Sequence, residues 1–143
     1  ANVLRCLARL DSFFGESRRT MNQITIVLPH PPLPLRPNSR THWRKKAQAV
    51  KAYRLAARLA ARTTLGMDAP PCWVKARVKV IWRSRTLIHP DPDNIIASLK
   101  AAFDGLADAG IVENDRGLWP ERPRIETRAS WGEVVITVEE DLE

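Results

Sequence analysis

Residues 73–110 of the chain read WVKARVKVIWRSRTLIHPDPDNIIASLKAAFDGLADAG, and this stretch decides the fold. Over residues 73–82, apolar and basic side chains alternate, which predicts a β-strand with one buried face and one basic face. Residues 94–109 then carry apolar side chains at helical spacing, and Gly110 follows them. This spacing predicts an amphipathic helix that ends at the glycine.

The two patterns also assign side chains to faces. In the strand, side chains two positions apart share a face, so one set points to the core and the other to solvent. The core set is Val74, Ala76, Val78, Val80 and Trp82, and the basic set is Lys75, Arg77 and Lys79. In the helix, the expected core residues are Ile95, Leu99, Ala102, Phe103 and Leu106.

Upstream of this stretch, a strand, a proline-rich connector and a helix are expected. Residues 23–28 (QITIVL) are rich in β-branched side chains, which is typical of a strand. Five prolines between residues 29 and 37 predict an extended connector, because proline fixes φ and donates no hydrogen bond. Residues 41–63 predict a helix capped by Thr41 and ended near Gly66. Its expected buried stripe is Trp43, Ala47, Val50, Ala57 and Ala61.

Downstream, residues 124–130 and 134–139 predict two further strands separated by a turn at Gly132. The order is therefore β-α-β-α-β-β, which predicts a single small α+β domain over residues 21–143, with a mixed sheet and two main helices. Residues 1–20 are expected to form an N-terminal extension outside this domain, either disordered or helical around Leu4, Leu7 and Leu10.

Composition limits the classes of protein that fit. The 143 residues suffice for one domain, and no apolar run approaches the ~20 residues that a membrane span needs. Two cysteines form neither a zinc knuckle nor a disulfide framework, which favours a reducing cytoplasm. No glycine-rich phosphate loop is present, so no nucleotide cofactor is expected.

Charge is divided unevenly along the chain. The net charge is +7, but residues 17–90 hold 16 basic residues and one acid, whereas residues 91–143 hold 5 basic residues and 13 acids. Such a basic half predicts a surface that binds a polyanion. Because no acid interrupts them, the expected phosphate contacts on the helix of residues 41–63 and just before it are Arg40, Arg44, Lys51, Arg58 and Arg62, together with Lys75, Arg77 and Lys79 on the strand.

The acidic half begins with a group of aspartates that suits metal-assisted hydrolysis. Asp91 and Asp93 are two residues apart, so in extended backbone their carboxylates share a face. Counted at 100° per residue, Lys100 and Asp104 lie on the helix face below Asp93, and Asp115 follows in the next loop. Carboxylates beside a cationic surface are what Mg²⁺-assisted phosphodiester hydrolysis requires. The alternative is that the same aspartates only cap the helix and form a turn.

This segment resembles the RusA family of Holliday junction resolvases, which phages and prophages often carry. The matching residues are Asp91-Pro92-Asp93-Asn94, Lys100, Asp104-Gly105-Leu106, Ala109-Gly110 and Asn114-Asp115, and residues 24–32 (ITIVLPHPP) are similar to the family's first strand and its exit. The resemblance covers about residues 21–140. Two positions differ from the family pattern: Lys100 follows Asn94 by six residues rather than about three, and Asn114 replaces an acid.

The resemblance implies that Asp91, Asp93 and Asp115 bind the catalytic Mg²⁺, for which Mn²⁺ is a possible substitute. It implies that Lys100 is the supporting cation, with Asn94 and Asp104 in further supporting roles. It also implies a homodimer, which agrees with the two-fold symmetry of a four-way junction. The predicted function is a Mg²⁺-dependent endonuclease that resolves four-way DNA junctions in recombination and repair. The alternatives are a non-catalytic, basic nucleic-acid-binding protein and a Mg²⁺ nuclease that acts on RNA or flaps.

Overall fold

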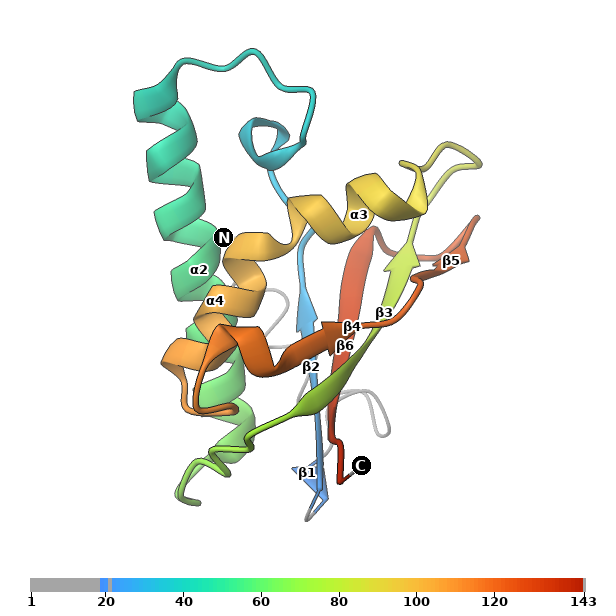
Figure 1. Ribbon diagram of the computed structural model, residues 1–143. Coiled ribbons are helices and arrows are strands. Elements are labelled where there is room, and N and C mark those ends of the chain that lie inside the picture. The colour runs from blue at the N-terminus through green and yellow to red at the C-terminus, as the bar shows by residue number, and fades with distance from the viewer. Residues whose placement is uncertain (1–18, 21, 143) are drawn as a thin grey trace.

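The computed structural model describes residues 19–20 and 22–142, and its centre is a six-stranded mixed sheet (Figure 1). The strand order is β1-β2-β6-β3-β4, and β5 also pairs with β3. Among these described strands, only the pairs of β3 with β4 and with β5 are parallel. The strands are β1 (Arg19–Thr20), β2 (Gln23–Leu28), β3 (Ala76–Arg83), β4 (Leu118–Pro120), β5 (Arg124–Glu126) and β6 (Glu133–Glu140).

The register of the long strands places their β-branched residues opposite one another. Ile26 on β2 pairs with Ile136 on β6, and Ile136 pairs in turn with Val80 on β3. All three side chains are buried. Burial of this kind stabilises the folded state by roughly 25 cal/mol for each Å² of apolar surface removed from water. One face of the sheet is therefore the floor of the hydrophobic core.

Helices cover that face. The long helix is α2 (Trp43–Leu65), and a second helical segment consists of α3 (Pro92–Ser98) and α4 (Lys100–Asp108). Two short 3₁₀ turns, η1 (Leu33–Leu35) and η2 (Asp115–Gly117), lie in the connections. Figure 1 shows these helices packed beside the sheet. Buried residues of α2, α3 and α4 join those of β2, β3 and β6 in one core.

Small side chains let α2 and α4 approach closely. The buried face of α2 includes Ala56, Ala57, Ala60 and Ala61, and α4 presents Gly105 to it. A Cβ atom added at Gly105 would collide with the carbonyl oxygen of Arg54 and lie 2.9 Å from the Cβ of Ala57. The alanine and glycine positions thus fix how near α4 lies to α2, and with it the position of the polar face of α4.

The α+β class, the mixed sheet and the domain's main order of elements are confirmed. The single helix expected over residues 94–109 is instead two helices, because the chain turns at Leu99 (φ −95°, ψ 3°). The expected core residues of this segment are nevertheless all buried, as are Ala76, Val78, Val80 and Trp82 on β3.

Three expected core residues are exposed, so those predictions are wrong. Trp43 is 67% exposed and Ala47 is exposed, because the first turns of α2 extend past the α4 helix that covers the later turns. Val74 is 73% exposed because it precedes β3, which begins at Ala76. The α2 helix is capped by His42 rather than Thr41: the His42 Nδ1 accepts a hydrogen bond from the Arg44 amide at 3.2 Å.

The prediction for residues 1–20 lies outside the described residues except at Arg19 and Thr20, which form the strand β1. Within residues 19–20 and 22–142, no helix combines the length and the apolar character needed to cross a membrane.

Candidate functional site

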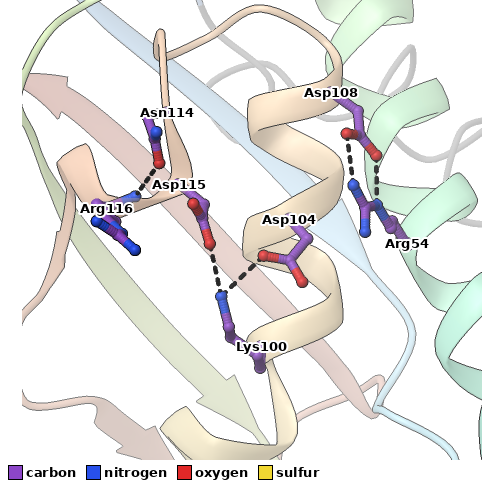
Figure 2. A network of polar contacts seen from close by, with 7 residues as sticks. All are labelled: Arg54, Lys100, Asp104, Asp108, Asn114, Asp115 and Arg116. Atoms are coloured by element: carbon purple, nitrogen blue, oxygen red, sulfur yellow. Dashed lines mark hydrogen bonds and ion pairs between the residues drawn. The ribbon is translucent and has the colours of Figure 1, made fainter.

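The polar face of α4 and the turn η2 together hold a three-residue charge cluster. The Lys100 Nζ donates a hydrogen bond to the Asp104 Oδ1 and another to the Asp115 Oδ2, each at 2.8 Å. Figure 2 shows the ammonium group between the two carboxylates. Lys100 and Asp104 meet because residues four apart on a helix are neighbours. Asp115 joins them because η2 returns the chain to the start of α4.

Contacts within the cluster shift the pKa values of Lys100 and Asp115 away from neutrality. Hydrogen bonds to Asp104 and Asp115 raise the pKa of Lys100. The hydrogen bond from Lys100 lowers the pKa of Asp115 below its ordinary value of 3.8. The Lys100 ammonium and the Asp115 carboxylate are therefore both charged at neutral pH, and such an ion pair can polarise a phosphate.

A second ion pair borders this cluster and was not predicted from the sequence. The Arg54 guanidinium on α2 binds Asp108 on α4 through two hydrogen bonds, Nε to Oδ2 at 2.5 Å and Nη2 to Oδ1 at 2.8 Å (Figure 2). The pair lowers the pKa of Asp108 and raises that of Arg54. Arg54, Asp108 and the three residues of the cluster line one hollow. No local sequence signal links Arg54 to Asp108, because their contact depends on how α2 packs against α4.

The first two predicted aspartates lie apart from this cluster. Asp91 is the N-cap residue of α3, and its carbonyl oxygen accepts the Ile95 amide hydrogen bond at 2.9 Å. Asp93 lines a different hollow, beside Ile96 and residues 120–123. Both side chains are exposed, and neither makes a hydrogen bond or ion pair with another described residue. In the part of the chain that the structure describes, no group of three His, Cys, Asp or Glu side chains is arranged to hold a metal ion.

The carboxylates of Asp104 and Asp115 nevertheless have the chemistry that Mg²⁺ requires. Their two oxygens converge on one cation, the Lys100 ammonium, at 2.8 Å each. Mg²⁺ in proteins is commonly held by one or two carboxylates, water and substrate phosphates. The donor set therefore fits a magnesium ion bound together with a phosphate.

The cations predicted on α2 and just before it are exposed, and they make no ion pair with another described residue. They are Arg40, Arg44, Lys51, Arg58 and Arg62. Arg58 is close enough to Asp108 to help lower its pKa, so this set of cations adjoins the α4 carboxylates. Arg44 lies over the exposed Trp43 ring, 5.2 Å from its centroid. We call these five cations the α2 cation stripe.

The cations predicted on β3 have a different environment. Arg77 and Lys79 point to the face of the sheet opposite the helices, because Val78 and Val80 point to the core. The Lys79 Nζ lies 3.3 Å from Glu139 Oε2, and the Lys75 Nζ lies 3.3 Å from Asp141 Oδ2. Lys75 and Lys79 thus face carboxylates of the chain's own C-terminal segment.

The fold and cluster define an α+β domain with a lysine-bridged carboxylate pair beside a basic helix. No family model matches the chain. An uncharacterized protein of Xylella fastidiosa (strain Temecula1) is 36% identical over 120 residues, which cover 80% of this chain and 74% of that protein. The chain therefore belongs to the same family as this Xylella protein.

Proposed function

We propose that this protein is a Mg²⁺-dependent, structure-selective endonuclease that resolves four-way DNA junctions by paired symmetrical nicks. The observation that carries the proposal is the contact of Lys100 with Asp115, at 2.8 Å. The RusA resemblance names these two residues as supporting cation and metal ligand, although fifteen positions separate them. Their meeting supports a common site despite the longer spacing between Asn94 and Lys100.

The residues around the cluster have complementary roles in this proposal. Asp104 holds the Lys100 ammonium in place, and the ammonium stabilises negative charge on the phosphate that is cut. The α2 cation stripe binds the flanking phosphates of the DNA backbone. When bound at Asp115, together with Asp91 and Asp93 or with Asp104, Mg²⁺ would neutralise the phosphate and activate water.

A homodimer is part of the proposal. A four-way junction has two-fold symmetry, and its resolution needs two cuts at related positions. One cluster in each subunit of a two-fold dimer supplies both cuts. A cytoplasmic location is proposed with it, since the substrate is chromosomal or phage DNA.

The second candidate is a basic nucleic-acid-binding protein without catalysis. The α2 cation stripe favours it, because its side chains have no acidic partner among the described residues and phosphate binding needs no metal. The separation of Asp91 and Asp93 from Asp115 favours it as well, because these two aspartates then add no ligand to the hollow that Asp115 lines.

One experiment separates the two candidates. The protein is incubated with a synthetic four-way junction and with linear duplexes of the same arms, with Mg²⁺ and with EDTA. The resolvase proposal expects symmetrical nicks in the junction alone, only with Mg²⁺, and their loss in the Asp93→Asn variant. Tight, salt-dependent binding without any cut would identify the binding protein. Full cleavage by Asp93→Asn would contradict the assignment of Asp93 as a ligand.

A further inference from the structure

A separate cavity of about 360 Å³ lies beside the start of α3, the helix that carries Asp93 and is preceded by Asp91. Its volume falls within the range of small-molecule sites. Three segments form it: the proline-rich connector after β2, the end of β3 with the loop that follows, and the inner face of α3. Its lining residues include His30, Arg36, Asn38, Trp82, Asn94 and Ser98.

Two aromatic residues that line this cavity, His30 and Trp82, hold each other in place. The His30 ring stacks on the buried Trp82 ring, with centroids 4.2 Å apart and an angle of 10° between the planes. The His30 Nε2 bonds to the Arg83 carbonyl oxygen at 2.7 Å, which holds the ring in its orientation. Burial lowers the pKa of His30, so the ring is neutral near pH 7. A flat, uncharged aromatic wall favours a planar ligand.

The polar groups of the cavity differ in depth. The buried hydroxyls of Ser84 and Ser98 donate to the carbonyl oxygens of Ile88 and Ile95. The side chains of Arg36, Asn38 and Asn94 make no hydrogen bond or ion pair with another described residue. Asn94 is half-buried, whereas Arg36 and Asn38 are exposed at the mouth.

These groups match the parts of one nucleotide. An amide such as that of Asn94 both donates and accepts, and so pairs with the edge of a base. A guanidinium at the mouth, such as Arg36, suits a phosphate. Unpaired bases are recognised in this way, by an aromatic surface together with hydrogen bonds to the base edge.

The place of the cavity connects it to the proposed reaction. Residues 89, 90 and 94 line it, and Asp91 and Asp93 lie between them in the chain. A nucleotide whose base enters the cavity therefore has its backbone beside these two aspartates. We propose that the cavity binds one unpaired base of the branched DNA and thereby selects the nucleotide at which the strand is cut. This inference rests on the proposed function and adds sequence selection to it.

The test measures base preference separately from cleavage. The substrates are four-way junctions whose crossover cannot migrate, with A, C, G, T or an abasic residue at each of the four positions next to the crossover. Fluorescence anisotropy measures how tightly the protein binds them in EDTA. The Asn38→Trp variant blocks the cavity from its exposed mouth without touching the core. Lys79→Gln, on the opposite face of the sheet, is the control. Circular dichroism verifies that both variants fold.

The wild-type protein is expected to bind the junction with one particular base about tenfold or more tightly than the junctions with the other bases. Its affinity for the abasic junction is expected to be lower by the same factor. Asn38→Trp is expected to bind all five junctions equally, whereas Lys79→Gln keeps the preference. With Mg²⁺ and a junction whose crossover can migrate, the wild-type protein is expected to cut next to the same base. Asn38→Trp is expected to cut at many positions without this preference.

Each other outcome has a distinct meaning. Equal binding of all five junctions by the wild type, or an unchanged preference in Asn38→Trp, overturns the inference even if junctions are cut. A base preference in EDTA without any cleavage supports the cavity assignment and refutes the nuclease. Free deoxynucleoside monophosphates serve as a further arm: if they bind in the cavity without competing with the junction, the cavity is a small-molecule site and the inference is wrong.

Discussion

Two regions of this domain carry dense charge, and they differ in how that charge is balanced. On the outer face of the sheet, Lys79 faces Glu139, and near the start of β3 Lys75 faces Asp141. On the helical side, the α2 cation stripe has no ion pair with another described residue, and the carboxylates beside it share Lys100 and Arg54. Two lysines thus pair with carboxylates in one region, whereas the cations in the other region are exposed and make no ion pair with another described residue.

A count of basic residues along the sequence therefore does not show which cations are left to bind a phosphate. In the sequence, the strand cations appear as exposed as the helix cations, since both sets lack nearby acids. The partners of the strand cations come from β6 and the residue just after it, about sixty residues later, through an antiparallel register.

The largest effect on stability is expected on the sheet, at Arg83. This residue binds Glu133 at 2.8 Å, and the Glu133 side chain is 2% exposed. Arg83→Met leaves a buried carboxylate without its guanidinium, which costs about 3–5 kcal/mol. Lys79→Met removes an exposed ion pair and costs about 1 kcal/mol or less. Urea denaturation measures both, and equal losses would contradict the difference in burial.

The next largest effect is expected on DNA binding. Changing Arg44, Lys51, Arg58 and Arg62 together to Gln should weaken junction binding about tenfold or more, and should reduce the salt slope by about 0.9 for each phosphate that the protein no longer neutralises. Changing Lys75, Arg77 and Lys79 to Gln should do less, because two of these lysines already have carboxylate partners. Anisotropy titrations at several salt concentrations provide the measurement. A larger slope change in the strand variant would reverse the assignment.

A smaller effect is expected on the acidity of one carboxyl group. Lys100→Met removes the hydrogen bond and the positive charge that lower the pKa of Asp115, so this pKa should rise toward 3.8. Lys75→Met, on the sheet, should leave Asp115 unchanged. NMR titration of the Asp115 carboxyl group measures this pKa in both variants. An unchanged pKa in Lys100→Met would rule out the contact in solution.

The smallest effect concerns pH near neutrality. The pKa values of Lys100 and Asp115 move away from pH 7 in opposite directions, so neither group makes stability depend on pH there. The pKa of His30 is lowered from 6.5, so the unfolded chain binds its proton more readily. Stability is therefore full above pH 6.5 and declines as the pH falls through the folded-state pKa. His30→Gln should abolish this decline, and the exposed His89→Gln should retain it, as measured by melting temperature from pH 8 to pH 5.

Local patterns in the sequence predicted most of the fold. The alternation in β3 and the apolar spacing around Leu99, Phe103 and Leu106 each reflect burial on one face, which short-range periodicity reveals. The break at Leu99 was missed because no glycine or proline marks it and the apolar residues continue through it. Trp43 was misplaced because periodicity does not show where the partner of a helix ends.

The candidate site was predictable only in part. Lys100 and Asp104 were assigned to one face by helical geometry, and they are in contact. The count from Asp93 to Lys100 assumed a continuous helix, which the turn at Leu99 interrupts. Arg54 and Asp108 were missed because only the packing of α2 on α4 brings them together. The buried ion pair of Glu133 with Arg83 was missed for the same kind of reason, because the two residues lie fifty positions apart in the sequence.

We propose that the Lys100 cluster cuts DNA, whereas the charged face of the sheet is structural. Single-turnover cleavage of a saturating four-way junction in Mg²⁺ tests it most directly, with Asp115→Asn in the cluster and Asp141→Asn on the sheet as a matched pair. We predict that Asp115→Asn binds the junction but cuts it about 100-fold or more slowly, while Asp141→Asn cuts at the wild-type rate. Wild-type cleavage by Asp115→Asn, or an equal loss in both variants, would contradict the claim.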